Sequence, residues 1–260
     1  MIFRRARRAL QRIRASETVK IRVVGLNHKT APLAVREKLT FGAVQVETAL
    51  AGLRAQFGET EFVLLSTCNR TELYLAARTD RLPREEDLIG FLGEFGQVKG
   101  DPLRDYFYVF ENEAAVGHLL TVASSLDSLV VGESQIVAQV KESYRRAVAG
   151  KYTGKVLNRL FHCAFATSKE VYTLTSIAQR RVSVAGVAIE LAGQLFAELA
   201  RAEVAVIGAG EMGELLVRHL QEEGCRVITV FNRTFRRAEA MAKRYGIQAG
   251  PWEEGPTSWT

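Results

Sequence analysis

The sequence predicts a two-domain protein of mixed class, with an N-terminal α+β domain, a helical connecting tract and a C-terminal α/β domain of Rossmann type. The first half alternates strand-like apolar runs with helical periodicity, whereas residues 112–200 show helical periodicity alone. A second strand–helix–strand pattern then begins at Glu203. The 260 residues, 47% hydrophobic and 25% charged, are enough for two such domains.

The expected elements of the first half are short strands and amphipathic helices. Apolar runs predict strands at 21–26, 62–65, 73–77 and 105–110. Apolar residues at helical spacing predict helices at 44–57 and 85–95, and then at 112–126, 134–149, 154–174 and 183–199. The second group is typical of the packing and connecting layer of a two-domain enzyme.

The net charge of +6 is concentrated in the first 20 residues, which hold seven Lys or Arg and one acid. Subtracting these from the 35 basic and 29 acidic residues of the chain leaves 28 of each, so a neutral body gives no support to a DNA-binding class. We expect residues 1–19 to form a disordered basic extension. A targeting peptide, a phosphate-binding arm and a wrongly chosen upstream start codon are its alternative explanations, and the last is favoured.

No apolar run approaches the roughly 18 residues of a membrane-spanning helix, and the N-terminus lacks a secretory signal. We therefore expect a cytoplasmic protein without membrane contact. Its three cysteines lack metal-ligand spacing, so reduced thiols and no metal site are expected. Cys163 and Cys225 lie in apolar packing contexts, whereas Cys68 lies in the polar string STCNRTE directly after the apolar run FVLL. Cys68 is therefore the candidate nucleophile.

A glycine-rich string joins the strand near Glu203 to the following helix. In this strand–turn–helix context it is a dinucleotide fingerprint, because its glycines permit a tight turn, approach of a pyrophosphate and close helix packing. The cofactor-binding residues predicted there are Gly208, Ala209, Gly210, Glu211, Met212 and Gly213.

The next strand ends in FNRTFRR, without the acid that an NAD site places on the ribose. Asn232, Arg233 and Thr234 are therefore predicted to bind the 2′-phosphate of NADP(H). Arg236 and Arg237 are equally well explained as a solvated helix face.

Taken together, several strings resemble glutamyl-tRNA reductases. They are VGLNHKTAPLAVREKL (24–39), LLSTCNRTELYL (64–75), HLLTVASSLDSLVVGESQIVAQVKESY (118–144) and VIGAGEMGELLVRHL (206–220) with NRT (232–234). The likeness spans residues 20 to about 254 in the family's order. It implies a catalytic, glutamyl-tRNA-binding domain at 20–175 and an NADP-binding Rossmann domain at 176–260.

The resemblance also implies a reaction. Cys68 would attack the ester of glutamyl-tRNA to give a thioester, and NADPH would reduce it to glutamate-1-semialdehyde, the precursor of 5-aminolevulinate and tetrapyrroles. His118 matches the family's active-site histidine, and His28 is interpreted as loop structure near the site. Arg70 is assigned to the substrate, although a cation there could instead lower the pKa of Cys68. The substrate-binding residues implied are Thr67, Asn69, Arg70, Ser128, Glu133, Ser134, Gln135 and Gln139.

By the same resemblance, tRNA(Glu) carries the substrate, full-length members are homodimers, and glutamate-1-semialdehyde aminomutase is a candidate partner. Ser134 stands where the family usually has proline, a change that a helix start tolerates. We expect an incomplete Rossmann domain and a missing dimerisation domain, explained by a frameshift or incomplete gene in preference to deliberate shortening. The alternatives to an active reductase are a fragment that only binds or deacylates glutamyl-tRNA, and an unrelated NADP dehydrogenase of the shikimate type.

Overall fold

The computed structural model describes residues 19–98, 101–128, 130, 132–175, 177, 184–196 and 198–254. The chain divides into two compact units, Met1–Arg180 and Arg181–Thr260, which are described separately here. The basic extension expected at 1–19 lies outside the described residues except for Val19, as does the C-terminal segment 255–260.

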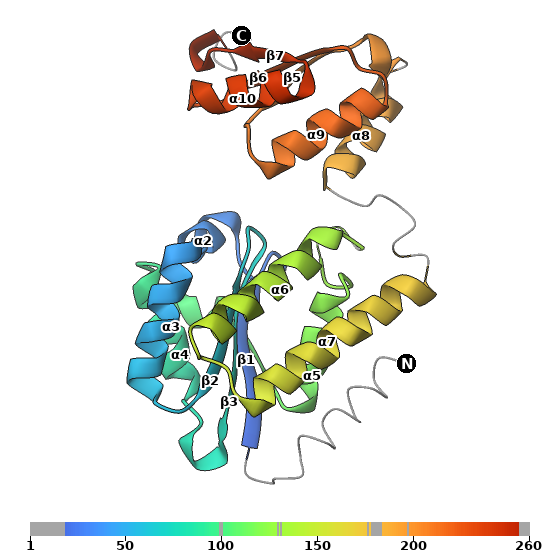
Figure 1. Ribbon diagram of the computed structural model, residues 1–260. Helices are drawn as coiled ribbons and strands as arrows, with labels where there is room; N and C mark the ends of the chain where they lie inside the picture. Colours follow the sequence, from blue (N-terminus) through green and yellow to red (C-terminus); the bar gives the residue numbers. More distant parts are fainter. Residues whose placement is uncertain are drawn as a thin grey trace. The chain divides into compact units, whose positions relative to one another are not determined.

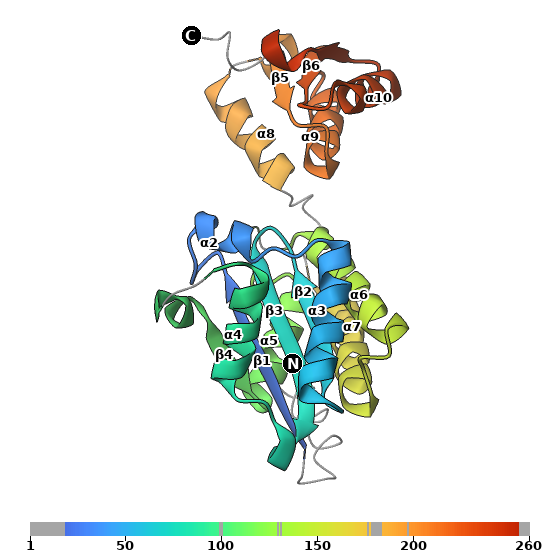
Figure 2. The same cartoon turned by 90° about the vertical axis from the view of Figure 1, so that its left-hand side faces the viewer.

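The first unit is built on a four-stranded antiparallel sheet in the order β2-β3-β1-β4. Its strands are β1 (Val19–Asn27), β2 (Glu61–Ser66), β3 (Arg70–Arg78) and β4 (Tyr108–Glu111), which Figure 2 shows side by side. β3 lies between β1 and β2 and is buried along all but its last residue. The strand predicted at 105–110 is partly wrong, because Asp101–Tyr106 form a 3-10 helix and the strand begins only at Tyr108.

Helices cover both faces of this sheet. They are α2 (Leu33–Lys38), α3 (Ala43–Phe57), α4 (Glu85–Phe95), α5 (Glu113–Ala123), α6 (Ser134–Ala149) and α7 (Lys155–Leu174). Figure 1 shows α3 and α4 on one side of the sheet and α5, α6 and α7 on the other. One apolar core joins both layers, with Tyr74 and Phe161 packed edge to face at 5.6 Å between ring centroids.

The second unit contains a three-stranded parallel sheet in the order β5-β6-β7. The chain enters through α8 (Val184–Leu195) and continues through β5 (Glu203–Ile207), α9 (Glu211–Glu222), β6 (Val227–Phe231), α10 (Phe235–Tyr245) and β7 (Gln248–Gly250). Parallel strands joined by helices form the predicted Rossmann-type pattern, so the mixed fold class is confirmed.

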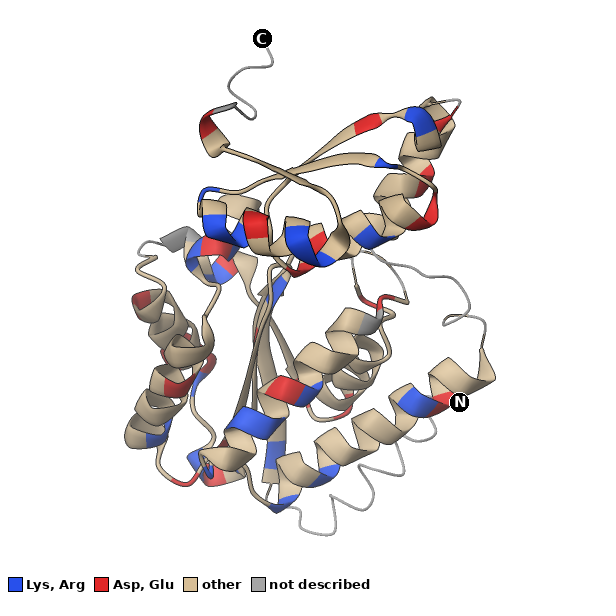
Figure 3. Ribbon diagram, turned by 45° about the horizontal axis from the view of Figure 1, so that its top comes forward, with Lys and Arg blue, Asp and Glu red and all other residues tan. Residues whose placement is uncertain are grey.

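Acidic and basic residues are interspersed along the helices of both units, as the coloured ribbon of Figure 3 shows. Within the described ranges, no helix is both long and apolar enough to cross a membrane. The same residues contain no cluster of three or more histidine, cysteine or acidic side chains suited to a metal ion.

Candidate active site

Cys68 lies at the tip of the tight turn between β2 and β3. The Thr67 hydroxyl accepts hydrogen bonds from the backbone N–H groups of Asn69 (3.2 Å) and Arg70 (3.1 Å), while the Thr67 N–H donates to the Arg70 carbonyl at 2.8 Å. A threonine in this position thus replaces backbone partners that so short a turn cannot supply. The thiol of Cys68 is exposed, whereas Cys163 is half-buried and Cys225 is buried.

A second set of contacts fixes the outer side of this turn. The Arg36 guanidinium, on α2, donates to the Cys68 carbonyl at 2.8 Å and to the Asn69 side-chain oxygen at 3.2 Å. The His28 N–H, just after β1, donates to the Asn69 carbonyl at 3.0 Å. A cation and two neighbouring segments therefore hold the cysteine turn in place.

Behind the turn, the side chain of Arg70 is only 2% exposed. Its guanidinium donates to Glu72 Oε1 at 2.7 Å and to Asp127 Oδ2 at 3.0 Å, and Asp127 also pairs with Lys29. This arrangement joins β3 to the loop after α5, 57 residues away in sequence. Because both ends of its guanidinium are engaged by carboxylates, the geometry favours a structural role for Arg70 over direct contact with a substrate.

Glu72 is fully buried beneath these residues, and its carboxylate has four side-chain hydrogen-bond partners. They are Arg70, Tyr74, Tyr108 and His118. Burial alone would raise the pKa of Glu72, but the Arg70 charge and the His118 and Tyr108 contacts outweigh it and hold the pKa far below its ordinary value. The carboxylate is therefore ionised, and burial beside it raises the pKa of both tyrosines.

His118 comes from α5 and is 12% exposed. Its Nε2 lies 2.8 Å from Glu72 Oε1, and its ring packs against Tyr108 and Phe110 with centroids 5.3 and 5.0 Å away. The structure thus brings the predicted His118 onto the same buried carboxylate as Arg70, which follows Cys68 by two residues.

Two buried polar atoms near this region find no hydrogen-bond partner among the described residues. They are the Ser128 hydroxyl and Nδ1 of His28. Burial and the charges of Arg70 and Lys29 lower the pKa of His28, so its ring is neutral. Ser128 directly follows Asp127, which pairs with Arg70 two residues after Cys68. Unpaired buried polar atoms are costly without a ligand or water, so both are suited to receive one.

The remaining predicted substrate residues lie at the start of α6. Glu133 is its N-cap, and burial raises the pKa of its carboxyl. Gln135 and Gln139 are half-buried and one turn apart on this helix. The side chain of Ser134 lies outside the described residues. Their role in binding a substrate therefore stays a prediction.

The glycine-rich turn of the second unit has the features that a dinucleotide site needs. Gly208 has a backbone φ of 108°, and a Cβ added at Gly208 or Gly210 would meet open space within 4 Å. By contrast, a Cβ on Gly213 would lie 2.0 Å from the Gly208 carbonyl oxygen. The first two glycines thus leave room for phosphates, and the third is required by close packing of α9.

The loop after β6 lies beside this turn. The Asn232 side-chain oxygen accepts from the Ala209 N–H at 3.2 Å, and its amide donates to the Thr234 carbonyl at 2.9 Å. Arg233 is exposed, with its guanidinium carbon 5.9 Å from the centre of the Trp252 ring. An exposed cation at the carboxyl end of a parallel strand fits a ribose phosphate.

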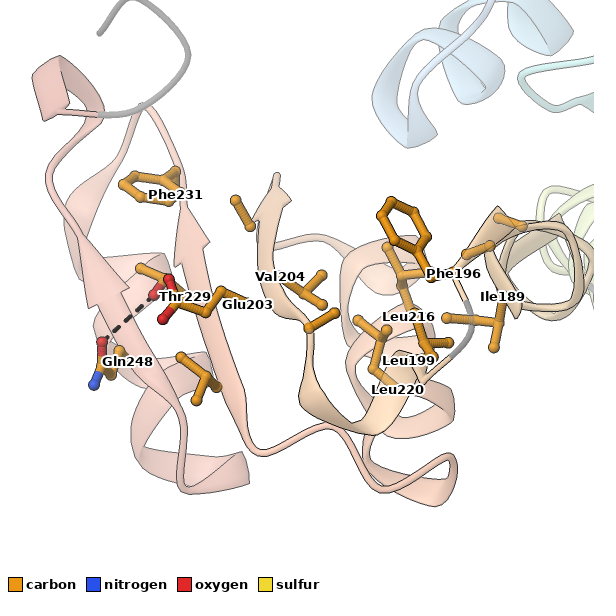
Figure 4. Close-up of a pocket in the computed structure, with 15 residues that line it drawn as sticks. Ile189, Phe196, Leu199, Glu203, Val204, Leu216, Leu220, Thr229, Phe231 and Gln248 are labelled. Carbon is orange, nitrogen blue, oxygen red and sulfur yellow. Dashed lines mark hydrogen bonds between the residues drawn. The ribbon is translucent and has the colours of Figure 1, made fainter. Parts of the chain in front are cut away.

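An apolar pocket of about 950 Å³ lies elsewhere in the second unit, between α8 and one face of the sheet. Figure 4 shows Ile189 and Phe196 on one side of it and Thr229 and Gln248, joined by a hydrogen bond, on the other. None of the residues Gly208–Gly213 lines it, and neither does Arg233. The pocket is therefore lined by other residues than the glycine-rich turn.

Sequence reasoning missed Arg36 and Glu72. The signal for Glu72 was available, because alternation along β3 places Arg70, Glu72 and Tyr74 on one face of an otherwise apolar strand. Arg36 gave no signal, since its contact with the cysteine turn crosses 32 residues.

Comparisons with known proteins cover both units. A family model described as "Glutamyl-tRNAGlu reductase, N-terminal domain" matches residues 24–175, and "Shikimate / quinate 5-dehydrogenase" matches 190–254. Among curated proteins, glutamyl-tRNA reductase from Rubrobacter xylanophilus is 45% identical over 230 residues, covering 88% of this chain and 53% of the relative. The corresponding protein of Geotalea uraniireducens is 44% identical over 236 residues, covering 91% and 54%.

A solved structure, glutamyl-tRNA reductase from Methanopyrus kandleri, is also similar. It superposes with a TM-score of 0.58 at 33% identity, covering 90% of this chain and 54% of the solved one. The chain thus spans about half the length of the relatives that it matches.

Proposed function

The chain belongs to the glutamyl-tRNA reductase family, and we propose that it serves in the NADPH-dependent reduction of glutamyl-tRNA to glutamate-1-semialdehyde, which begins 5-aminolevulinate and tetrapyrrole synthesis. The observation that carries this proposal is the position of Cys68. It is the exposed cysteine of the chain and lies on a turn held by Thr67 and Arg36. A fixed, accessible thiol is what acyl transfer requires.

In the proposed first step, the Cys68 sulfur attacks the ester carbonyl that joins glutamate to the terminal ribose. A carbon–sulfur bond forms, the carbon–oxygen bond to the ribose breaks, and the ribose oxygen takes a proton as tRNA leaves. The Ser128 hydroxyl and Nδ1 of the neutral His28 ring find no hydrogen-bond partner in the described part of the chain, so both are suited to polar groups of the glutamyl moiety. Thr67 and Asn69 shape the turn, and His118 is the candidate proton carrier.

The second unit is proposed to bind NADPH, which when bound supplies the hydride that reduces the thioester carbonyl. Gly208 and Gly210 leave space for the pyrophosphate at the N-terminus of α9, and the exposed Arg233 is suited to pair with the 2′-phosphate. We accordingly assign catalysis to residues 20–175 and cofactor binding to 176–260. Homodimerisation and transfer of the aldehyde to glutamate-1-semialdehyde aminomutase remain proposals for the whole protein.

The test is to incubate the purified chain with glutamyl-tRNA labelled in the glutamate, with and without NADPH. Acid quenching and mass spectrometry should find glutamate on Cys68, and semialdehyde should appear only with NADPH. Release of free glutamate at the same rate with and without NADPH would favour the deacylating alternative. Absence of both the thioester and deacylation would refute the proposal.

A further inference from the structure

We propose that Glu72 is a positioning residue that holds the proton of the neutral His118 ring on Nε2, leaving Nδ1 as the nitrogen that exchanges a proton during the reaction. The protonation pattern follows from the contacts of the first unit alone. Its use in acyl transfer rests on the proposed function.

The acceptor that faces His118 is the Glu72 carboxylate. An ionised carboxylate can only accept hydrogen bonds, and Glu72 receives Arg70 Nη1 at 2.7 Å and the Tyr74 hydroxyl at 2.6 Å, together with the Tyr108 hydroxyl. His118 Nε2 approaches Oε1 of the same carboxylate at 2.8 Å. At this distance Nε2 must donate, because a lone pair facing Oε1 would repel it.

The surrounding charges keep Glu72 ionised. Arg70 lies on one side of the carboxylate and is itself paired with Asp127, and the hydroxyls of Tyr74 and Tyr108 complete the shell. Burial and the Glu72 charge raise the pKa of both tyrosine hydroxyls. These hydroxyls therefore stay protonated and remain donors. A neutral Glu72 would remove one of the two carboxylates that pair with the buried Arg70 charge, and the other, Asp127, is shared with Lys29, so neutralisation is costly.

The strand opposite also leaves room for this carboxylate. Gly25 on β1 is paired in register with Glu72, and a Cβ at position 25 would lie 2.7 Å from Glu72 Cγ. The position of the Glu72 side chain is therefore fixed by the pairing of β1 with β3.

With Nε2 committed, Nδ1 is the lone-pair nitrogen of the neutral ring, and no hydrogen bond to it is found among the described residues. The ring keeps 12% exposure and is held between α5 and the aromatic side chains of β4. Nδ1 can then take the proton of an attacking thiol and return it to the departing ribose oxygen, while Glu72 stabilises the intervening imidazolium.

The decisive experiment reads the tautomer directly. The full chain is labelled with ¹⁵N-histidine, and long-range ¹H–¹⁵N spectra are recorded at neutral pH. The sequence has four histidines, His28, His118, His162 and His219, so His118→Gln identifies the signal of interest. We expect Nε2 of His118 to be protonated and Nδ1 to be the lone-pair nitrogen. An Nδ1–H ring in the wild-type chain would overturn the proposal without any variant of Glu72.

Two variants then test the cause. Glu72→Gln removes the charge, and we expect the Nδ1–H form to rise at least about tenfold, with thioester formation slowed by about 10²-fold. Tyr74→Phe removes another hydrogen bond of Glu72 but keeps the charge, so the tautomer should be unchanged. A His118 tautomer that is the same in Glu72→Gln would refute the positioning role, and circular dichroism establishes that each variant is folded.

The two proposals fail separately. An Nε2–H ring in a chain that forms no thioester on Cys68 would support the positioning of His118 and refute the proposed function. A thioester on Cys68 in a chain whose His118 ring carries its proton on Nδ1 would support the proposed function and refute the positioning of His118.

Discussion

Replacing Gly213 by alanine tests whether the turn of the second unit is a close-packed cofactor site. The added methyl carbon would lie 2.0 Å from the Gly208 carbonyl oxygen, more than 1 Å inside ordinary contact. A backbone carbonyl cannot rotate away as a long side chain can, so α9 or the turn must move. Overpacking of this kind costs about 1–3 kcal/mol.

A matched control separates this clash from helix propensity. Gly193 is also a helical glycine of the second unit, in α8, and a methyl group there meets nothing within 4 Å. Gly193→Ala should therefore stabilise by about 0.5–1 kcal/mol. Because both variants gain the same propensity, their free energies of unfolding should differ by the clash alone, about 1–3 kcal/mol.

Tryptophan emission provides the assay for the stability of the second unit. Both tryptophans of the chain, Trp252 and Trp259, lie in the C-terminal unit, so urea unfolding followed by their emission reports on that unit. NADPH binding by calorimetry provides the functional measurement, and Gly213→Ala should weaken it while Gly193→Ala leaves it unchanged. Equal stability of the two variants, or undiminished NADPH binding by Gly213→Ala, would refute the reasoning.

Four further outcomes are expected. Cys68→Ser should abolish the glutamyl thioester seen by mass spectrometry while Cys163→Ser retains it, and a thioester that persists in the first variant would disprove the assignment. Arg233→Ala should cost roughly 1–3 kcal/mol of NADPH binding and leave NADH binding nearly unchanged, so equal calorimetric losses would argue against a 2′-phosphate contact. Gly25→Ala should lower the stability of the first unit by about 1–3 kcal/mol in chemical unfolding, because its methyl group would press on Glu72, and an unchanged midpoint would contradict this packing. The pKa of Glu72 is depressed in the folded state, so the ionised carboxylate contributes fully to stability above about pH 5, and this contribution is lost as the pH falls through the folded pKa. Amide exchange in β3 should therefore accelerate in acid. Glu72→Gln should remove that dependence on pH.

The sequence was informative wherever a local pattern determines the structure. The glycine-rich turn was predictable because strand, turn and helix adjoin in the chain, and the exposed position of Cys68 followed from a polar string after an apolar strand. The short β7 was missed, since Gln248–Gly250 contains no apolar run. Aromatic residues suggested a strand over 105–110, but its first two residues end the 3-10 helix Asp101–Tyr106 and the strand begins only at Tyr108.

Contacts that span long stretches of chain could not be predicted in this way. Arg70 was assigned to the substrate because no local signal points to Asp127, which lies 57 residues later and holds the other end of its guanidinium. The same holds for His118, whose carboxylate partner lies 46 residues earlier. Alternation along β3 places Arg70 and Glu72 on one face, but only the folded sheet shows that this face is buried.

The side chain of Asn232 has a thermodynamic consequence for the second unit. Its amide group accepts a hydrogen bond from the glycine-rich turn, which is proposed to face the pyrophosphate, and donates one within the loop that carries Arg233. The pyrophosphate and the 2′-phosphate of a bound dinucleotide would therefore contact two segments that Asn232 joins. Ordering the glycine-rich turn would then also order the loop after β6. Inorganic pyrophosphate and adenosine 2′-phosphate should accordingly bind with positive cooperativity, each tightening the other, and this linkage should vanish in Asn232→Ala.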